Sequence, residues 1–462
     1  MKHTLASLTA LLLVPLVALH VAWTWCRNKQ AFTFLAIFGL AASGMAAEFF
    51  IRDGDRVAFL GDSITEGGKY TTYLQAYVLT RHPHWRITFR NVGWRGDTAW
   101  LRNRYHTDET ALFRADPVTQ QKMVNDAVIN GLGHDVLPLN PTVVTVAMGM
   151  NDSYAARIEE AYPPFIRAET KIVEMLKEKG VRVALLTPQA MEGGGPPPDL
   201  DGGNKALKIF SDGIKEVAAA TGVPFVDQYI PYLAICVSAH AANPGQFLYA
   251  NAGDRIHPSA LGQTIQAWII LKALGASALV SRVEINSATK TVVAAEACRI
   301  EKLTVADGVI RFERSDDVLP MPIPPEAMPA LKLAPILDNL NRYELQVTGL
   351  APGSYELSID GEAVTKLTAA ELAKGWNLAA STGPITRQGQ ELLQQIKEKD
   401  ELFYSRWRKV QLFEVPEWAQ KPADARTAEL ARLDQKIAEA EAQIDKLRQP
   451  HPHHFELKPV VL

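Results

Sequence analysis

Four short blocks of the sequence contain the residue types that nucleophilic catalysis uses. The first block holds a serine directly after an apolar run, and the last holds an aspartate followed three residues later by a histidine. The two blocks between them are rich in glycine, asparagine and aspartate. A serine, a histidine with an aspartate, backbone N–H donors and an asparagine amide are the groups that acyl transfer requires. In chain order, the blocks are residues 61–63, 91–98, 149–152 and 253–259.

Strand-like and helix-like segments alternate around these blocks. Residues 57–60 form an apolar run typical of a buried parallel strand, and a helical pattern begins soon after Ser63. Repeated βα units of this size predict a parallel sheet with helices on both faces, over about residues 54–278. Ligands of such sheets bind at the carboxyl ends of the strands, so we expect the four blocks to meet at one edge. The further strand-like runs are residues 87–92, 142–148, 181–186 and 223–226.

The serine of the first block has a plainer explanation when taken alone, because serine and aspartate often cap a helix without any catalytic role. The other blocks favour catalysis, and the absence of a Gly-x-Ser-x-Gly elbow excludes the nucleophile of an ordinary α/β-hydrolase. We expect Asp62 to cap the turn and Asp152 to orient Asn151 rather than contact substrate. Trp94 and Trp100 are expected in the core, with stacking on a sugar ring as the alternative.

In these blocks the sequence resembles the SGNH hydrolases, also called GDSL esterases and lipases. The resemblance covers about half of the chain, residues 55–274, and its one departure is Ile64, where the family usually has leucine. All four family blocks occur in the family's order, which makes the resemblance specific. The matching residues are Gly61, Asp62 and Ser63, then Gly96 before Asp97 and Thr98, then Gly149 to Asp152, and finally Asp254 and His257.

The resemblance implies a flavodoxin-like doubly wound sheet and a serine esterase that needs no metal or organic cofactor. Ser63 Oγ would attack the ester carbonyl, and His257 would take the serine proton and return it to the leaving alcohol. Asp254 would fix the imidazole tautomer and stabilise the imidazolium. The N–H groups of Ser63 and Gly96 and the side-chain amide of Asn151 would form the oxyanion hole.

Two apolar stretches, residues 5–22 and 32–42, lie within the N-terminal residues 1–47. The second stretch follows basic residues and precedes small residues, which is the pattern of a signal peptide. The first is either an additional membrane anchor or an upstream extension, and its length is marginal for a spanning helix. We therefore expect an exported protein, periplasmic or secreted, which the first stretch could anchor in the membrane.

Length, charge and cysteine content set further bounds. A chain of 462 residues is expected to form two to three domains. The net charge of −3 gives no reason to expect nucleic acid as a partner. Three cysteines cannot form a disulfide framework, although Cys236 and Cys298 could pair after export.

The sequence changes in character after the predicted hydrolase domain. Residues 279–384 contain short strand-like runs separated by turns, which predicts a β-rich accessory region. Residues 385–448 carry two helical patterns, expected to pack as a hairpin or against the hydrolase domain. Residues 449–462 include three histidines and are expected to form a solvated tail. The glycine- and proline-rich residues 193–203 are either a rim of the site or a surface insertion.

The leading hypothesis is an exported serine esterase that removes an acetyl or another short acyl group from a polar substrate such as a glycan. Export, glycine-rich polar loops and a β-rich accessory region favour this substrate class by analogy. One alternative is a lysophospholipase or lipase for longer acyl chains, which an apolar groove beside the serine would favour. The other is a non-catalytic glycan-binding module on the same fold.

Overall fold

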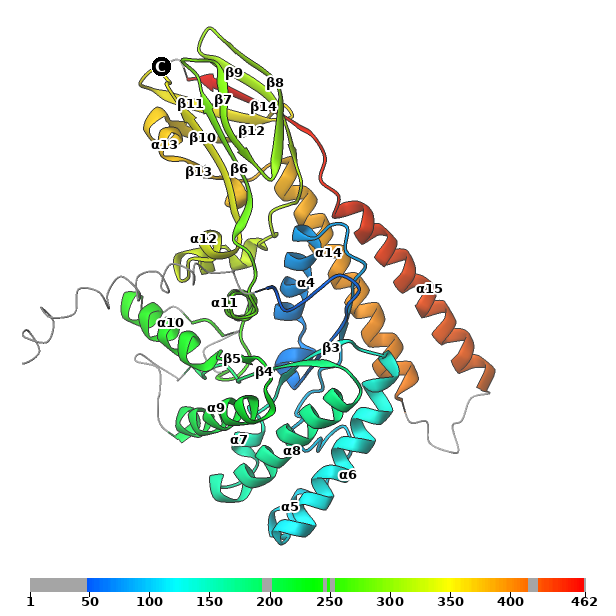
Figure 1. Cartoon of the computed structure of the whole chain (residues 1–462). Coiled ribbons are helices and arrows are strands. Elements are labelled where there is room, and N and C mark those ends of the chain that lie inside the picture. Colours follow the sequence, from blue (N-terminus) through cyan, green and yellow to red (C-terminus); the bar gives the residue numbers. More distant parts are fainter. Residues whose placement is uncertain (1–47, 193–201, 244–246, 250–253, 414–422, 461–462) are drawn as a thin grey trace, which may run out of the picture. The chain divides into compact units, whose positions relative to one another are not determined.

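The computed structural model describes most of the chain (Figure 1). The predicted export segments lie outside the described residues, and all elements named below belong to one structural unit, residues 49–462. Within the described residues, we find no helix long and apolar enough to cross a membrane. The described residues are 48–192, 202–243, 247–249, 254–413 and 423–460.

A five-stranded parallel sheet in the order β2-β1-β3-β4-β5 forms the centre of the hydrolase region. This is the flavodoxin-like order, so the predicted fold class is confirmed. Gly61 lies opposite Ala147, so β1 and β3 end level, and β2 ends beside them at Asn91, opposite Phe59. The strands are β1 (Arg56–Gly61), β2 (Thr88–Asn91), β3 (Val143–Ala147), β4 (Arg182–Leu186) and β5 (Phe225–Val226).

Helices cover both faces of this sheet, and the alternation of β1 shows why. Val57 and Phe59 belong to one hydrophobic core, together with residues of α4 and α11, whereas Ala58 and Leu60 belong to a second core with residues of α6 and α8. Both faces of the strand are thus buried, as its unbroken apolar run predicts. The helices are α4 (Lys69–Arg81), α5 (Glu109–Arg114), α6 (Pro117–Asp135), α8 (Ile158–Glu178), α9 (Gly202–Thr221), α10 (Tyr229–Ala242) and α11 (Ala260–Ala273) (Figure 1).

Two further sheets make up the β-rich region, in the orders β13-β10-β6-β7 and β12-β11-β14-β9-β8. Two of its hairpin turns are Asp-Gly pairs, Asp307-Gly308 and Asp360-Gly361, in which both residues have φ between 51° and 83°. Positive φ at both central positions is what a tight hairpin turn requires. The strands are β6 (Leu279–Asn286), β7 (Thr291–Glu296), β8 (Cys298–Ala306), β9 (Val309–Asp316), β10 (Arg342–Thr348), β11 (Ser354–Ile359), β12 (Glu362–Thr368) and β13 (Trp376–Asn377).

Short helical elements join these strands and connect them to the hydrolase region. They are a 3₁₀ segment (Pro325–Lys332), α12 (Ile336–Leu340) and α13 (Ala369–Lys374). The 3₁₀ segment and α12 pack on α11, because Ala327, Ala330 and Ile336 share its hydrophobic core. The β-rich region is therefore tied to the helix that follows the predicted catalytic histidine.

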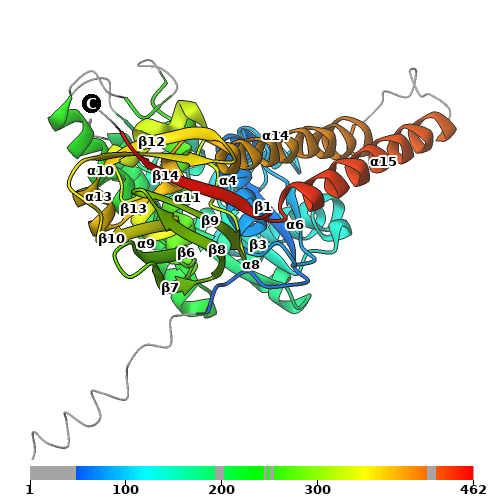
Figure 2. The same ribbon diagram turned by 90° about the horizontal axis from the view of Figure 1, so that it is seen from above.

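The C-terminal residues correct one prediction. We expected a solvated tail over residues 449–462, but β14 (His453–Pro459) inserts between β9 and β11 as an interior strand (Figure 2). Phe455 and Leu457 are buried, and His453 Nδ1 lies 2.6 Å from Asp360 Oδ2. The prediction failed because β14 pairs with strands that are distant in sequence, so no neighbouring segment indicates the pairing.

The two C-terminal helices satisfy both arrangements that the sequence left open. Helices α14 (Pro384–Tyr404) and α15 (Ala423–Leu447) pack against each other, and α14 also runs along α4 (Figures 1 and 2). Lys399 Nζ donates to Gln75 Oε1 of α4 at 2.6 Å. Arg90 of β2 forms an ion pair with Glu441 of α15 at 2.8 Å.

Cys236 and Cys298 do not form the disulfide considered above. Both thiols are free, because Cys236 lies in the core of the hydrolase region and Cys298 in that of the β-rich region.

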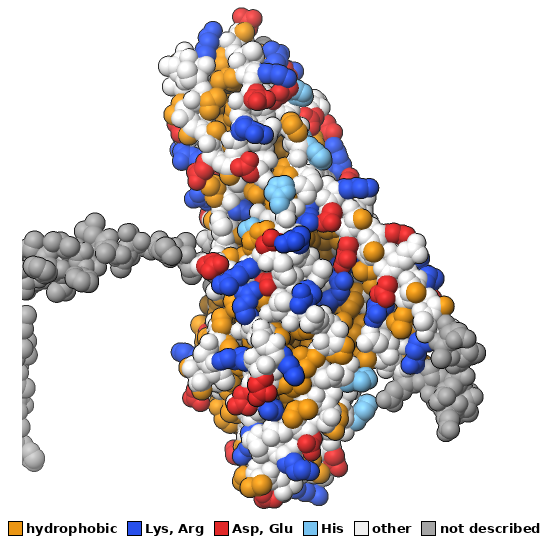
Figure 3. Space-filling view, turned by 45° about the vertical axis from the view of Figure 1, so that its right-hand side comes forward, with side chains coloured by type: hydrophobic (Ala, Val, Ile, Leu, Met, Phe, Trp, Pro, Cys, Tyr) orange, Lys and Arg blue, Asp and Glu red, His pale blue; other side chains and the backbone are white. Residues whose placement is uncertain are grey.

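The surface charge does not indicate a binding site for nucleic acid. Figure 3 shows acidic and basic side chains interspersed over one face, in keeping with the small net charge of −3.

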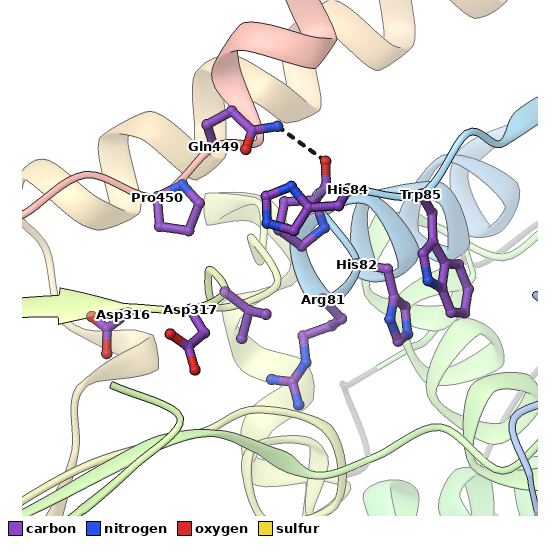
Figure 4. A pocket seen from close by; sticks show the side chains of 10 residues that line it. Arg81, His82, His84, Trp85, Asp316, Asp317, Gln449 and Pro450 are labelled. Carbon is purple, nitrogen blue, oxygen red and sulfur yellow. Dashed lines mark hydrogen bonds between the residues drawn. The ribbon is translucent and has the colours of Figure 1, made fainter. Parts of the chain in front are cut away.

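A cavity of about 580 Å³ lies at the carboxyl end of α4, where the three regions meet (Figure 4). Arg81, His82 and Trp85 line it from the hydrolase region, Asp317 from the loop after β9, and Gln449 from the segment before β14. Gln449 Nε2 donates to the Pro83 carbonyl at 3.0 Å. Helix α4 has 13 residues and therefore spans about 20 Å, which separates this cavity from the serine before its other end.

Candidate active site

Ser63 lies at the turn between β1 and the one-turn helix α3 (Ser63–Glu66). Asp62 caps this helix, because its Oδ1 accepts a hydrogen bond from the Ile64 N–H at 2.9 Å. A side chain at Gly61 would collide with the next turn of the chain, 2.1 Å from an added Cβ. The tight turn therefore requires glycine at this position, and it leaves Ser63 partly exposed at the edge of the sheet.

His257 and Asp254 approach Ser63 from the loop that precedes α11. His257 Nε2 lies 2.8 Å from Ser63 Oγ, and His257 Nδ1 lies 3.2 Å from Asp254 Oδ2. The other Asp254 oxygen accepts hydrogen bonds from the backbone N–H groups of Ile256 and His257, at 3.0 and 2.9 Å. These bonds hold the carboxylate against the imidazole, so the structure brings together the three residues predicted as nucleophile, base and orienting acid.

The environment of Asp254 keeps its carboxyl group ionised. Partial burial would raise its pKa, but the backbone N–H groups of His257 and Ile256, together with the imidazole, lower the pKa below its usual range. An ionised Asp254 stabilises a positive imidazolium. The His257 side chain is 46% exposed, so the serine–histidine pair is accessible from solvent.

Gly96 and Asn151 lie in the loops after β2 and β3, beside the end of β1. Asn151 Nδ2 donates to the Asp97 carbonyl at 2.9 Å, which joins the two loops. Gly96 has a φ of +73°, and an added Cβ would lie 2.6 Å from the Asn103 amide. Among the described residues, no hydrogen-bond partner engages the Gly96 N–H. This amide is therefore available to an oxyanion, and only glycine fits the loop that presents it.

Asp152 holds the third block against the second. It begins α7 (Asp152–Ala155), and its two carboxyl oxygens accept hydrogen bonds from the N–H groups of Ala99 and Gly149, at 2.8 and 3.0 Å. Burial raises its pKa to about 7, against the lowering effect of these two bonds. Asp152 therefore positions the loop that carries Asn151 and lies too deep to touch substrate.

Arg104 is a positioning residue that no sequence motif marks. Its guanidinium is buried and lies 3.1 Å from Asp97 Oδ2 and 2.6 Å from Asp135 Oδ2, and it donates to the Val92 carbonyl. These bonds clamp both sides of the loop around Gly96. No motif signals this role, because Asp135 lies 31 positions away in the sequence and only the fold brings it to Arg104.

Glu66 is a second residue that sequence reasoning missed. Its carboxylate accepts a hydrogen bond from the Arg95 N–H at 2.6 Å, directly before Gly96 in the chain. Because Glu66 ends the helix that Ser63 begins, this bond links the nucleophile turn to the glycine loop. Only the proximity of both residues to the family blocks could have suggested it.

Two tryptophans and two histidines outside the four blocks' catalytic groups serve packing. Trp100 is fully buried, and Trp94 packs edge-on against Trp407 of the segment after α14, with ring centroids 5.9 Å apart. His240 is buried against a glutamate at 2.5 Å, and His82 stacks on a neighbouring tryptophan. None of these side chains belongs to the serine–histidine–aspartate cluster.

Residues 193–201, within the loop that could rim the site, lie outside the described residues. In the part of the chain that the structure describes, no group of three or more histidine, cysteine, aspartate or glutamate residues is placed to hold a metal ion.

Glu169 of α8 is a buried carboxyl group whose ionisation affects the stability of the fold. Its carboxyl group is 1% exposed, and neither oxygen has a hydrogen-bond partner among the described residues. Burial, with a smaller contribution from Asp152, raises its pKa from 4.5 to about 8. The unfolded chain releases this proton near pH 4.5, whereas the folded protein retains it up to about pH 8, so this group makes folding less favourable as the pH rises through that window.

We expect Glu169→Gln to remove this pH dependence. The variant should match the wild type near pH 4 and exceed its free energy of unfolding by about 4 kcal/mol at pH 8. Urea denaturation at both pH values measures the difference. Glu174→Gln, on the exposed side of the same helix, is the control and should show no change. Equal effects of Glu169→Gln at pH 4 and pH 8 would mean that Glu169 does not titrate abnormally.

The fold and the site define the class of the protein, a serine hydrolase of carboxylic esters. Residues 59–265 match the GDSL-like lipase/acylhydrolase family. The predicted family resemblance and the predicted enzyme class are thereby confirmed. A search of curated proteins finds no match to the chain.

Two solved structures illustrate the similarity. A gut microbial diltiazem-metabolizing enzyme is 26% identical, with a TM-score of 0.72 over 89% of this chain and 98% of its own. An acetylxylan esterase from Geobacillus stearothermophilus is 21% identical, with a TM-score of 0.37 over 49% of this chain and 96% of its own. The first similarity extends beyond the hydrolase region, so the β-rich region and C-terminal helices belong to a shared architecture.

Proposed function

We propose that this enzyme is exported and hydrolyses a short O-acyl ester, an O-acetyl ester above all, of a polar substrate such as a glycan. The observation that carries the chemistry is the 2.8 Å contact between Ser63 Oγ and His257 Nε2, with Asp254 behind the imidazole. This arrangement transfers the serine proton at the moment when Ser63 Oγ attacks the ester carbonyl.

The reaction runs in two stages. Ser63 Oγ adds to the carbonyl carbon while its proton passes to His257, and the resulting oxyanion receives hydrogen bonds from the N–H groups of Ser63 and Gly96 and from Asn151 Nδ2. His257 then protonates the departing alcohol, which leaves an acyl-Ser63 intermediate. Water, deprotonated by His257, attacks the acyl carbon and releases the carboxylic acid and free Ser63.

Polar surroundings support a polar alcohol and a short acyl group. The cleft that borders the residues after Ser63 is lined largely by charged side chains, among them Glu66, Lys69 and Arg95. A long acyl chain laid in such a cleft would strip water from these charges without replacing it. The solved structure that is similar over 89% of this chain is a diltiazem-metabolizing enzyme, which supports a small-molecule substrate.

Export is supported by the sequence alone. Residues 32–42 are apolar, follow basic residues and precede small residues, which is the order of a signal peptide. Residues 5–22 form the further apolar stretch that could anchor the enzyme in a membrane. Cell fractionation of the tagged full-length chain, with cytoplasmic and periplasmic marker proteins, tests this assignment.

A series of p-nitrophenyl esters tests the acyl specificity. We expect kcat/KM to be highest for acetate and to fall with each longer chain, and we expect acetate release from acetylated xylo-oligosaccharides. Ser63→Ala protein measures the background hydrolysis of each ester. A maximum at octanoate or longer would instead assign the enzyme to the lipases and lysophospholipases.

A further inference from the structure

A cleft of about 640 Å³ lies between the turn after Ser63 and the carboxyl end of α14. Glu66 and Gly67 line it within one helical turn, about 5 Å, of Ser63. Arg95 also lines the cleft and directly precedes Gly96, so the Cα atoms of these two residues are about 3.8 Å apart. The lining therefore includes residues that adjoin both the predicted nucleophile and the predicted oxyanion loop along the chain. The volume of the cleft is within the range of small-molecule sites, about 300–1,000 Å³.

The opposite wall of the cleft comes from α14, outside the family's shared domain. Asp400 fixes this wall, because its Oδ2 accepts hydrogen bonds from Thr72 Oγ1 at 3.2 Å and from Gln75 Nε2 at 2.8 Å. Trp407, just beyond the helix, donates from Nε1 to the Asp135 carbonyl at 3.0 Å. These hydrogen bonds hold α14 and the segment after it against the hydrolase region where α14 lines the cleft.

A π-helical segment, Ser405–Gln411, follows α14 and contributes to the lining of the cleft. Such wide turns are rare in proteins and occur frequently at functional sites. Here the segment brings Ser405 and Lys409 into the lining beside Tyr404, and Lys409 Nζ lies 5.4 Å from the centre of the Tyr404 ring. Arg408 of the same turn stacks on Trp94, which anchors the segment to the loop after β2.

The lining suits a neutral ligand with many hydroxyl groups. Carboxylates of Glu66 and Glu401 and cations of Arg95 and Lys409 occur together, and the lining holds four groups of each sign. The carboxylates can accept hydrogen bonds from hydroxyl groups, and the cations can donate hydrogen bonds to them. The half-buried Tyr404 has an aromatic ring against which a sugar ring could pack. A charged or wholly apolar ligand would leave one set of these groups unpaired.

We propose that this cleft is the subsite for the alcohol part of the ester, a carbohydrate unit whose acyl group lies at Ser63. The C-terminal helices are then part of the substrate site. This inference rests on the proposed function, since it specifies what the proposed esterase releases.

Two variants in the lining of the cleft test it, Tyr404→Ala and Lys409→Ala. For acetylated xylo-oligosaccharides we expect KM to rise about tenfold in Tyr404→Ala and about threefold in Lys409→Ala, with kcat within twofold of the wild type. For p-nitrophenyl acetate, which carries no sugar, both constants should stay within about twofold. Lys436→Ala, an exposed lysine of α15 outside the cleft, is the matched control.

The outcomes separate the two proposals. Unchanged KM for the acetylated sugar in both variants would overturn the subsite while leaving the esterase proposal standing. Equal losses on both substrates would assign Tyr404 and Lys409 a structural role and also overturn the subsite. If the wild type cleaves p-nitrophenyl acetate but no acetylated sugar, the substrate class itself fails and the subsite fails with it.

Discussion

Ser63→Ala is expected to lower kcat for ester hydrolysis by about 10⁴- to 10⁶-fold, the range seen when a triad nucleophile is removed. Within the described residues, no other hydroxyl group forms a hydrogen bond with His257, so no second side chain could replace Ser63 as the nucleophile. Turnover of p-nitrophenyl acetate by purified protein, against a blank without enzyme, measures the loss.

His257→Ala should produce a loss of similar size, and the double variant should be no worse than either single variant. Residues that act as a unit in one step give such non-additive effects. His134→Ala, at the end of α6, is the matched control and should retain full activity. A Ser63→Ala protein that keeps more than about a tenth of wild-type activity would contradict the mechanism.

Asn151→Ala is expected to lower kcat by about 10²- to 10³-fold, with a much smaller change in KM. The amide would act on the oxyanion, which exists only in the transition state and intermediate, so its loss raises the barrier more than it weakens substrate binding. Steady-state kinetics with p-nitrophenyl acetate resolve the two constants.

Two further variants make the Asn151 result interpretable. Asn130→Ala, an exposed asparagine of α6, controls for the loss of an amide elsewhere and should leave both constants unchanged. Asn151→Asp keeps the shape of the side chain but places an acceptor where the oxyanion forms, so it should be at least as impaired as Asn151→Ala. Full activity of Asn151→Asp would exclude the amide from the oxyanion hole.

The central sheet was predictable because its signals are local. The unbroken apolar run before Ser63 marks a strand buried on both faces, and the glycines at 180, 222 and 275 mark the ends of the helices that separate the strands. The blocks that hold Asn151 and His257 were predictable for a related reason. Each follows a strand or precedes a helix of this sheet, and a doubly wound topology brings such positions to one edge.

The contacts that support the site were not predictable, because their partners are distant in sequence. Arg104 meets Asp135 from 31 positions away, and Lys399 meets Gln75 from 324. Nothing in the local sequence around these residues distinguishes them from solvent-exposed charges. Their burial follows from how the helices pack, which a single sequence does not specify.

In the β-rich region, pairing between neighbouring strands was predictable from the sequence, whereas pairing between distant strands was not. The Asp307-Gly308 turn and its flanking strands could be read locally, since hairpin pairing joins neighbours in the chain. Strand β14 pairs instead with β9, whose residue Arg314 lies opposite His453. Only the tertiary structure reveals such long-range pairing, so the local sequence of residues 449–462 does not predict a strand.

Labelling with a fluorophosphonate probe tests most directly whether Ser63 is the activated nucleophile. The folded wild type should react, and mass spectrometry of the digested protein should place the added phosphonyl group on the peptide that contains Ser63. Ser63→Ala protein should remain unlabelled under the same conditions. Failure of folded wild-type protein to react, or equal labelling of Ser63→Ala, would contradict the assignment.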